Sequence, residues 1–408
     1  MMKLLVIAGN VSKTPDGVTY SFVFDEIYRL AKRGFEVHAV RSRIDKDDYL
    51  YNIYFHGLEE GLGINEFFSY IWRLGKIHPL GFLRNPKVVY WEGKYHSRIV
   101  KVVEECKTDI IHAHFAYPEG LVGMLTAKKV KKPLVVTVHG YDVLTEPTVG
   151  YGIRLSKRLD LLVKKVLNSG DAIICNSTTL YEEVRRIVED ENKVHLIFNG
   201  VDLQRFSYGD SIEAREKLGL PLDKFIVFTV RHHEPKYGIE FLIRAAPYIV
   251  SQKKDVLFVI GGDGSLRRYH VELTKKLNVA SYFIFTGVIP QRILQLYYVA
   301  SDVVVVPSLQ EAWGLVVTEA LASGKPVVGS DVGGIKDQII EGYNGFLVPP
   351  RNSLAIAERI LYFIDNPSEM YRMGMNGRRL AEEKFDIEKR INRVIEVYEK
   401  VLSGYRGR

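Results

Sequence analysis

Short runs of hydrophobic residues alternate along the chain with longer stretches in which hydrophobic residues return every three or four positions. The short runs are rich in β-branched residues and apolar almost from end to end, which is typical of parallel strands buried on both faces. The longer stretches predict amphipathic helices, such as 18–31, which stops before Gly34. The expected strands are 3–8, 36–41, 109–113, 134–138, 171–176 and 193–198, then 225–230, 256–260, 282–286, 302–306 and 326–329.

This alternation occurs twice, which predicts an α/β protein with two doubly wound, Rossmann-like domains. Residues 200–225, between the two halves, contain Gly, Pro and charged residues but no buried strand. The predicted domains are 1–203 and 204–385. A last amphipathic helix, about 386–404, follows the complete second sheet and is able to pack back on the first domain or stay with the second. Ligands of such sheets bind beyond the carboxyl ends of the strands, so the expected site is a cleft where two sheets face each other.

The bulk properties of the 408 residues limit the classes of protein that fit. With 47% hydrophobic and 26% charged residues, the chain has the profile of a soluble globular protein. No apolar run reaches the ~20 residues of a membrane-spanning helix, and the N-terminus reads as a first strand rather than a signal peptide. Two cysteines, Cys106 and Cys175, are too few for a disulfide framework. These features predict a cytoplasmic protein in a reducing compartment.

The net charge of +7 favours anionic partners in general, but the basic residues are scattered over the predicted helices. No helix combines an Arg-rich face with an aromatic platform, so a nucleic acid partner is not expected.

Residues 57–94 stand out as an insertion that mixes aromatic and basic residues. One interpretation is an element that binds an acceptor or touches the inner face of a membrane weakly, because aromatic and cationic side chains suit a lipid interface. The other is a helix pair that covers the first sheet, and we favour it because aromatic stripes are usually core. The aromatic residues are Phe67, Phe68, Tyr70, Trp72, Phe82, Tyr90 and Trp91.

The most informative segment is 302–334, DVVVVPSLQEAWGLVVTEALASGKPVVGSDVGG. A buried strand leads into a loop with Glu311, and a helix starts near Gly314. Free N–H groups at a helix start form an anion site, and a glycine lets a phosphate approach the backbone closely. Glu319, about one turn into the helix, is placed to accept hydrogen bonds from ribose hydroxyls, and Glu311 from the hydroxyls of a sugar ring. Two Glu residues flanking a helix start are also explained by N-terminal charge stabilisation, so these residues alone leave both interpretations open.

The segment resembles the signature of the retaining glycosyltransferases of family 4, a group related to glycogen synthase and sucrose synthase. That signature places two Glu residues in a P-S-x-x-E-x-x-G-L-x-x-x-E-A block, followed by G-x-P-V-V and paired glycines. The matching residues are Pro307, Ser308, Glu311, Gly314, Leu315, Glu319, Ala320, Gly324, Pro326, Val327, Val328, Gly333 and Gly334. The pair Ala312–Trp313 departs mildly from the family and is expected to affect the sugar pocket. The resemblance implies the GT-B architecture and a nucleoside diphosphate sugar as donor, bound at the amides near Gly314 and Leu315.

The family's diphosphate-binding cations follow the first strand of the second domain. Arg231 and Lys236 in TVRHHEPKYG have the family spacing, although Val230 replaces a glycine and Tyr237 is inserted before Gly238. The resemblance therefore implies that both cations hold the diphosphate, where negative charge grows as the glycosidic bond breaks.

Three further positions match the family. His139 follows a strand of the first domain at the place of the family's histidine beside the transferred sugar. Gly17, after Asp16, matches one of two paired glycines near the donor phosphates, and Asp263 lies in the GGDG turn after the next strand of the second domain. His112 and His114 are read as interior residues. The catalytic set implied is Glu311, His139, Arg231 and Lys236, with retention either through a covalent intermediate or, as we favour, by attack from the side of the leaving group.

The resemblance also implies that no cofactor and no essential metal are needed. Asp45–Lys46–Asp47 has the spelling of a metal motif but is read as a solvated turn, and His232–His233 is too short a cluster to predict zinc. The lack of G-x-G-x-x-G after the first strand disfavours dinucleotide redox chemistry. The alternatives are a sugar-nucleotide epimerase or hydrolase on the same scaffold, or a non-catalytic nucleotide-sugar-binding subunit. The donor base and sugar, the acceptor and the oligomeric state are left open.

Overall fold

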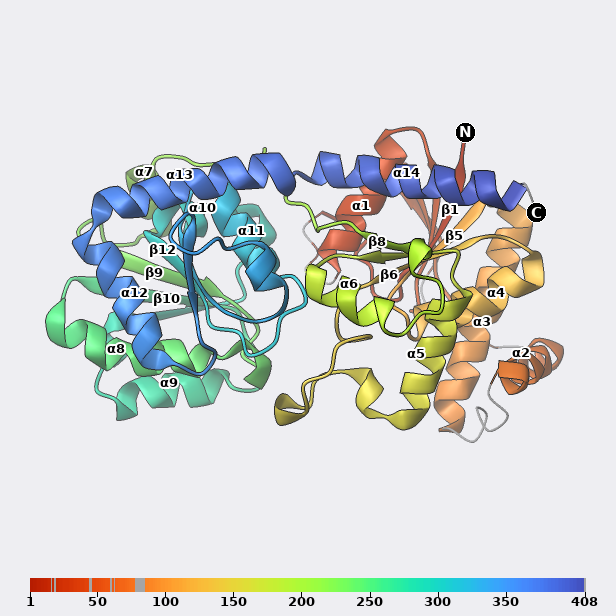
Figure 1. The fold of residues 1–408 in the computed structure, drawn as a ribbon, viewed down its shortest axis with the longest axis horizontal. Coiled ribbons are helices and arrows are strands. Elements are labelled where there is room, and N and C mark those ends of the chain that lie inside the picture. Colours follow the sequence, from red (N-terminus) through yellow and green to blue (C-terminus); the bar gives the residue numbers. More distant parts are fainter. Residues whose placement is uncertain are drawn as a thin grey trace. The chain divides into compact units, whose positions relative to one another are not determined.

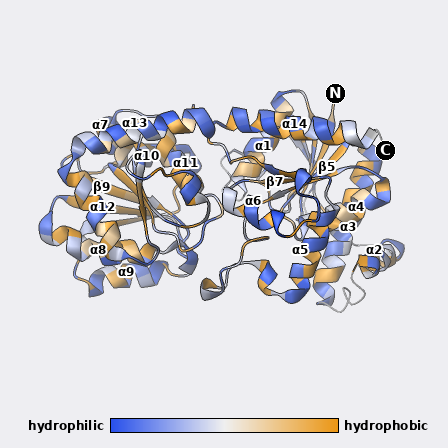
Figure 2. Cartoon of the chain, in the orientation of Figure 1, coloured by the Kyte–Doolittle hydropathy of each residue, from blue (hydrophilic) through white to orange (hydrophobic). Residues whose placement is uncertain are grey.

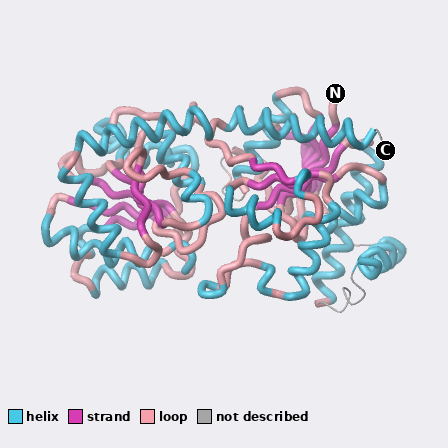
Figure 3. Tube along the Cα trace, viewed as in Figure 1, coloured by secondary structure: helices cyan, strands magenta, loops and turns pink. Residues whose placement is uncertain are grey.

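The computed structural model describes residues 1–15, 17, 20–43, 46–58, 61, 63–77 and 85–406. The chain forms two compact units, one of Met1–Ile197 with Ile391–Arg408 and one of Phe198–Arg390. Each unit contains a sheet with helices on both sides, coloured magenta and cyan in Figure 3. The strands are mostly hydrophobic, and the helices alternate between hydrophobic and hydrophilic residues (Figure 2). Two doubly wound, Rossmann-like α/β domains are therefore confirmed.

The sheet of the first unit has eight strands in the order β3-β4-β2-β1-β5-β6-β7-β8. Figure 1 labels β1, β5, β6 and β8 of this sheet. All pairs are parallel except β3 with β4. The strands are β1 Lys3–Ile7, β2 Glu36–Val40, β3 Asp48–Leu50, β4 Ile53–His56, β5 Ile110–His114, β6 Leu134–Val138, β7 Ala172–Cys175 and β8 Val194–Leu196.

Helices cover this sheet and connect its strands, as expected for parallel pairs. They are α1 Ser21–Lys32, α2 Ile64–Ile77, α3 Pro86–Cys106, α4 Glu119–Val130, α5 Lys157–Ser169, α6 Thr178–Arg185 and the larger part of α14 Ile387–Arg406, with short 3₁₀ turns at η1 Pro147–Val149, η2 Ile153–Leu155 and η3 Glu191–Lys193. No helix among the described residues is long and apolar enough to cross a membrane.

The sheet of the second unit has six parallel strands in the order β11-β10-β9-β12-β13-β14. The strands are β9 Phe225–Val230, β10 Val256–Gly261, β11 Phe283–Gly287, β12 Val303–Val306, β13 Val327–Ser330 and β14 Gly345–Val348. Its helices are α7 Ser211–Leu218, α8 Ile239–Gln252, α9 Arg267–Lys276, α10 Gln291–Ala300, α11 Leu315–Ala322, α12 Ser353–Asp365 and α13 Pro367–Lys384, with 3₁₀ turns at η4 Pro235–Tyr237, η5 Ala280–Tyr282 and η6 Gly333–Asp337.

Two hydrophobic cores sandwich this second sheet. One core joins the strands to α7, α10 and α11, and the other joins them to α8, α9 and α12, while α13 contributes to both. Burial on both faces explains why the strands are continuously apolar in sequence. The carboxyl ends of β9, β10 and β12 therefore lie side by side at one edge of the sheet, which is where the predicted donor residues follow in sequence.

The division between the units falls after Ile197, earlier than the predicted boundary at 203/204. The reason is that Val201 is tied to the second unit, since its N–H donates to the carbonyl of Phe385 (2.7 Å) and its carbonyl accepts from Ile387 (3.2 Å). The chain returns to the first unit within α14, where the hydroxyl of Tyr398 lies 2.6 Å from Nδ1 of His112.

The sequence reading missed three short strands. β3 and β4 lie in a stretch that reads as a charged loop, and β14 stands between Asn344 and two prolines, a context typical of a turn. In the insertion over 57–94, α2 and α3 form a helix pair as expected, and Tyr70 is fully buried, but Phe68, Trp72 and Tyr90 are exposed. Phe82 lies outside the described residues.

Candidate active site

Arg231 is the first residue after β9, and its side chain lies almost completely inside the second domain. Its backbone N–H donates to the carbonyl of Gly261 at the end of β10, which extends the sheet by one residue (3.1 Å). Nη1 of Arg231 lies 3.0 Å from Oε2 of Glu311. The two residues that the sequence assigned to diphosphate and sugar are therefore brought together by adjacent strands, β9 and β12.

The guanidinium of Arg231 carries donors that no described residue satisfies. Nε and Nη2 are buried and have no hydrogen-bond acceptor among the described residues. A buried cation with unsatisfied N–H groups is costly, and such groups normally have a partner. The remaining donors fit an oxyanion such as a phosphate, which a guanidinium binds through two parallel hydrogen bonds.

Lys236 lies in η4, in the same loop as Arg231. Both cations lie near the ring of Tyr237, with Nζ of Lys236 4.5 Å and Cζ of Arg231 5.3 Å from its centroid. The inserted Tyr237 thus contacts both cations. The carbonyl of Lys236 accepts from the N–H of Leu309 (2.7 Å), which ties this loop to the loop after β12.

Two glycines permit the close approach of these loops. A side chain at Gly238 would meet the carbonyl oxygen of Pro307 at 2.1 Å, and one at Gly333 would meet the carbonyl oxygen of Glu311 at 1.7 Å. Gly333 also has a φ of +47°, which favours glycine. The N–H of Gly334 donates to the carbonyl of Glu311 (3.1 Å), so η6 fixes the backbone beneath the Glu311 carboxylate.

Gly314 precedes α11 with a φ of +91°, and none of the side chains that the structure describes caps this helix start. Gln338 fixes the loop before this helix, because its amide nitrogen donates to the carbonyls of Trp313 and Gly334. Trp313 is buried and stacks on Phe198 with ring centroids 5.2 Å apart. The Ala312–Trp313 pair therefore packs into the core, and the expectation that it shapes the sugar pocket is wrong for the tryptophan ring. Leu315, the first residue of α11, is partly exposed.

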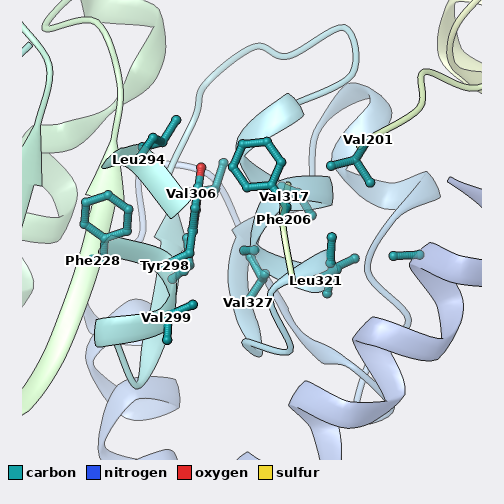
Figure 4. Packing of buried hydrophobic residues seen from close by; sticks show 14 of the residues in the cluster. Val201, Phe206, Phe228, Leu294, Tyr298, Val299, Val306, Val317, Leu321 and Val327 are labelled. Atoms are coloured by element: carbon teal, nitrogen blue, oxygen red, sulfur yellow. The ribbon is translucent and has the colours of Figure 1, made fainter. Parts of the chain in front are cut away.

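Glu319 lies one turn into α11 and is held by a tyrosine that the sequence reading did not single out. The hydroxyl of Tyr298, in α10, lies 2.6 Å from Oε2 of Glu319. The ring of Tyr298 is fully buried in the core with Phe228 and Phe206 (Figure 4). Burial, followed by the charge of Glu319, raises the pKa of Tyr298 well above its ordinary value, so the hydroxyl stays protonated and donates to the carboxylate.

Asp263 follows β10 and is exposed, and its carboxylate accepts from the N–H of Gly264 (2.8 Å). Its carbonyl accepts from the N–H of His233, two residues after Arg231 (3.0 Å). His233 is buried and shares a hydrogen bond with His270 of α9 (Nδ1 to Nδ1, 2.8 Å). Burial lowers the pKa of His270 to about 4, so this pair is neutral and anchors the Arg231 loop.

In the first domain His139 follows β6 and lies among aromatic rings. The ring centroids of Phe115 and Phe22 lie 4.5 and 4.8 Å from that of His139. Nε2 of His139 lies 3.1 Å from Nδ1 of His114, and the two rings are almost parallel. His139 is half-buried, and its Nδ1 is the nitrogen not engaged by His114.

His112 and His114 are buried, as expected for interior residues. His112 has a hydrogen-bond partner at each nitrogen, Tyr398 at 2.6 Å and Thr137 at 2.7 Å. Glu26 of α1 lies within ion-pair distance of both histidines, with Oε1 3.7 Å from Nδ1 of His112 and 3.6 Å from Nε2 of His114. His114 therefore links a buried carboxylate to His139, a role that its place in the sequence did not indicate.

A second buried carboxylate orders the backbone around His139. Asp142 accepts hydrogen bonds from the N–H groups of Ala116 (2.7 Å), His139 (3.1 Å) and Gly140 (2.9 Å). It thereby joins the loop after β5 to the loop after β6. The spacing His139–Gly140–Tyr141–Asp142 was the available signal, since an aspartate soon after a strand often caps its own turn.

Gly17 lies in the loop between β1 and α1, where its N–H donates to the carbonyl of Thr14 (3.2 Å). A side chain there would meet Oγ of Ser12 at 1.8 Å, so the glycine permits a tight turn. Asp16 and Val18 lie outside the described residues. The structure thus places Gly17 and His139 in the first domain, and Arg231, Lys236, Glu311, Gly314, Leu315, Glu319 and Asp263 in the second.

Comparisons with known proteins match each of the two domains to a family. Residues 210–380 match the family described as "Glycosyl transferases group 1", and residues 21–205 match "Glycosyltransferase Family 4". An uncharacterized glycosyltransferase of Methanocaldococcus jannaschii is 30% identical over 301 residues, which cover 74% of this chain and 78% of the relative. A D-inositol 3-phosphate glycosyltransferase of Catenulispora acidiphila is 30% identical over 279 residues, covering 66% of this chain and 65% of the relative, just under two thirds of its length.

Solved structures show the same fold. Sucrose-phosphate synthase from Thermosynechococcus elongatus superposes with a TM-score of 0.80 at 23% identity, covering 99% of this chain and 100% of that one. HepE from Anabaena, solved in complex with UDP-glucose, superposes with a TM-score of 0.76 at 20% identity, covering 98% and 100%. The predicted GT-B architecture is therefore confirmed.

Proposed function

The chain belongs to the group 1 glycosyltransferases of family 4, and from this membership we propose that it transfers a sugar from a nucleoside diphosphate sugar to an acceptor, with retention of anomeric configuration. As a member of this family it is a transferase. The proposal concerns the donor, the stereochemistry and the residues that act.

The observation that carries the proposal is the buried guanidinium of Arg231. Nε and Nη2 lack an acceptor among the described residues, and Nη1 is paired with Glu311, beside the start of α11. A phosphate group supplies acceptors for the unsatisfied N–H groups and a negative charge beside the guanidinium, because its oxygens accept several hydrogen bonds and are anionic. Fixed cations around a diphosphate also stabilise the charge that develops on the leaving oxygen.

The remaining roles follow the layout of the second domain. Lys236, which lies near the ring of Tyr237, is proposed to bind the diphosphate together with Arg231 and the amides at Gly314 and Leu315. Glu319, held by Tyr298, is proposed to accept hydrogen bonds from ribose hydroxyls, and Glu311 from the sugar. In the first domain, His139 is proposed to contact the transferred sugar and Gly17 the phosphates. No metal or cofactor enters this scheme.

A thermal-shift panel of UDP, GDP, ADP and their sugar conjugates tests the donor site. A ligand at 100 times its dissociation constant stabilises the fold by about 2.7 kcal/mol. We expect one nucleotide family to raise the midpoint and Arg231→Ala to abolish the shift. Arg244→Ala, which removes an arginine paired with Glu240 on the surface of α8, is the matched control. No shift with any nucleotide would overturn the donor proposal.

Measuring the consumption of the donor with and without an acceptor distinguishes a transferase from a hydrolase, an epimerase or a binding subunit. A hydrolase or epimerase consumes the donor without any acceptor, and a binding subunit does not consume it at all. D-inositol 3-phosphate is a first acceptor to test because several relatives are named for it. The anomeric configuration of the product, read by NMR from the coupling constant of its anomeric proton, decides retention. Product of inverted configuration would contradict the proposed mechanism.

A second proposal concerns α2, which we propose binds weakly to an anionic membrane surface. Ile64, Phe68 and Trp72 are 74%, 64% and 58% exposed and recur every four residues, so they form one apolar stripe. Nζ of Lys76 lies 3.5 Å from the centroid of the Trp72 ring, next in the same series. An exposed apolar stripe that ends in a cation matches the interface of a negatively charged leaflet. The cytoplasmic location stays a prediction.

Sedimentation with vesicles tests this surface. We expect binding to vesicles that contain phosphatidylserine, none to phosphatidylcholine alone, and loss of binding in the double variant Phe68→Ser, Trp72→Ser. Tyr371→Ser, at a similarly exposed aromatic residue of α13, is the control. Equal binding by the parent protein and the double variant would contradict the assignment to α2.

A further inference from the structure

Four side chains at one end of the first sheet form a continuous row. Oε1 of Glu36 lies 3.1 Å from Nε2 of His38, Nδ1 of His38 lies 3.0 Å from Nε2 of His56, and Nδ1 of His56 lies 3.0 Å from Oδ2 of Asp47. Glu36 and His38 belong to β2, His56 ends β4, and Asp47 directly precedes β3. Asp47 is exposed, as expected for a residue of a solvated turn, and its carboxylate also contacts His56 and Arg98. Asp45 lies outside the described residues.

The hydrogen bonds in this row cannot all be made by neutral histidines. A carboxylate only accepts hydrogen bonds, so the nitrogen facing Glu36 and the nitrogen facing Asp47 must each carry a proton. A neutral imidazole has one N–H, so the two inner nitrogens then present lone pairs to each other at 3.0 Å. The ring planes are inclined by only 16°, with centroids 5.3 Å apart, so these nitrogens meet edge to edge. The row therefore needs one additional positive charge, either a proton held within it or a metal ion between the rings.

A third ligand lies next to this pair. Cys106, the last residue of α3, is partly exposed, and its Sγ and one nitrogen of each histidine all lie within 4.8 Å of one another. Two imidazoles and a thiol form a ligand set that suits Zn²⁺, which binds nitrogen and sulfur donors in tetrahedral sites. A shared proton would fill the gap between the histidines but would leave Cys106 without a part in the cluster.

The surroundings match those of a metal centre. Histidines that bind metals almost always donate their other N–H to a carboxylate, and here both do so. The carboxylates are themselves fixed, Glu36 by Lys3 (2.8 Å) and Asp47 by Arg98 and by the N–H of Gly57 (3.1 Å). With Zn–N distances of about 2.0–2.1 Å and a tetrahedral angle, the two nitrogens would lie about 3.4 Å apart. They need to separate by only a few tenths of an ångström and tilt toward a common point.

We propose that His38, His56 and Cys106 bind one Zn²⁺ ion that joins the edge strand β4 and the end of α3 to β2. The ion has a structural role, and glycosyl transfer does not pass through it. The fully buried group of Glu26, His112 and His114 is less suited. The partners of His112 are the hydroxyls of Tyr398 (2.6 Å) and Thr137 (2.7 Å), which can donate or accept, so a neutral histidine satisfies both contacts without an added cation.

Metal titration of the full chain tests the site. Protein stripped with a chelator is titrated with Zn²⁺ by calorimetry and, separately, with Co²⁺, whose thiolate complexes absorb in the near ultraviolet. We expect one ion per chain, a thiolate-to-cobalt band that disappears in Cys106→Ser, and at least tenfold weaker Zn²⁺ binding in His56→Gln. Glu36→Gln, which keeps the size of the side chain next to His38, should weaken binding by about 10–100-fold.

His195→Gln is the matched control, because His195 is a partly buried histidine of β8 outside the cluster. Circular dichroism of each variant verifies that it is folded, and Cys106 is partly exposed, so its replacement by serine is mild. The proposal fails if the chain takes up no Zn²⁺, or if Cys106→Ser and His56→Gln bind it as tightly as the parent protein. It also fails if the cluster changes only with pH and the cobalt band is absent, which would indicate a shared proton. None of these readouts depends on glycosyltransferase activity.

Discussion

Arg231 and Glu311 form an ion pair, with Nη1 of the arginine 3.0 Å from Oε2 of the glutamate. Both side chains are largely buried, at 6% and 13% exposure, so their interaction is only weakly screened by solvent. A diphosphate that binds Arg231 must share this cation with Glu311. The ion pair therefore couples two roles that the sequence assigned separately, one to the diphosphate and one to the sugar.

The first prediction separates these roles with inorganic pyrophosphate, which has neither base nor sugar. Arg231→Ala should weaken pyrophosphate binding at least tenfold, because hydrogen bonds to charged groups contribute about 1.5–3 kcal/mol. Glu311→Gln removes the competing negative charge but keeps the shape, so pyrophosphate should bind as tightly or more tightly while sugar transfer falls more than tenfold. Calorimetry and a donor-consumption assay measure the two effects. If Glu311→Gln weakens pyrophosphate binding as much as Arg231→Ala, the assignment of Glu311 to the sugar is wrong.

The second prediction concerns the hydrogen bond from Tyr298 to Glu319 (2.6 Å). Tyr298→Phe leaves the buried ring in place but releases the carboxylate. We expect the nucleoside diphosphate identified in the thermal-shift panel to bind about three- to tenfold more weakly, in line with the 0.5–1.5 kcal/mol of one hydrogen bond. Pyrophosphate binding should not change, because it has no ribose.

Tyr297→Phe is the control for this variant. Tyr297 is the neighbouring residue in α10 and stacks on Phe228 with ring centroids 5.7 Å apart. Removing its hydroxyl should leave nucleotide binding unchanged. Equal losses for nucleoside diphosphate and pyrophosphate in Tyr298→Phe would indicate that the tyrosine supports the whole loop and not Glu319 alone.

Much of the fold was predictable because parallel strands buried on both faces leave a strong local signal. Every strand of at least five residues was expected from an apolar run, and the start of α11 was indicated by Gly314. β3 was missed because its three residues begin with Asp48 and lie in a charged stretch, and β14 because it stands between Asn344 and two prolines, whereas the equally short β7, β8, β12 and β13 lie in clearer apolar runs. β4 escaped because its four residues alternate polar and apolar between charged segments.

The candidate site was predictable only where its residues fall in short sequence motifs. Arg231, Glu311 and Glu319 stand in a recognisable series, whereas Tyr298 reaches Glu319 from another helix and Asp142 joins two separate loops. Such contacts depend on which strands are neighbours in the sheet and which helices pack beside them. The strand order cannot be read from the local pattern of a single sequence. The row from Glu36 to Asp47 was missed for the same reason, since β4 pairs with β2 across the chain segment that contains β3.

The third prediction concerns Gly333. A methyl group there would lie 1.7 Å from the carbonyl oxygen of Glu311, and the backbone has a φ of +47°. Gly333→Ala should therefore displace the Glu311 loop, weaken pyrophosphate binding at least tenfold and lower the free energy of unfolding by about 1–3 kcal/mol. Calorimetry and urea denaturation measure these changes. Gly75→Ala, in α2 with no described neighbour within 4 Å of the added methyl group, should instead be neutral or slightly stabilising. Unchanged pyrophosphate binding in Gly333→Ala would show that the loop backbone does not position the donor site.

The fourth prediction concerns Glu119, a buried carboxyl group at the start of α4. Its Oε1 accepts a hydrogen bond from the N–H of Gly9, at the beginning of the loop that leads to Gly17 (3.1 Å). Burial raises the pKa of Glu119 from its ordinary value of 4.5 to about 7, although the hydrogen bond from Gly9 opposes the shift. The protonated form is therefore the one that the fold favours.

The folded protein keeps a proton on Glu119 that the unfolded chain releases above about pH 4.5, so its contribution to stability is complete below that pH. The contribution is lost as the pH rises from 4.5 through about 7. Such a shift corresponds to on the order of 3 kcal/mol. Because Glu119→Gln is neutral at every pH, it should match the parent protein at pH 4 and be more stable at pH 8. Urea denaturation at both pH values measures the difference in the free energy of unfolding between variant and parent. His96 and His270, whose pKa values are lowered, make stability rise with pH, but both proteins contain them and their effect cancels in the difference. Glu216→Gln, at an exposed residue of α7, is the control, and an equal gain at pH 4 and pH 8 would contradict the assignment to ionisation of Glu119.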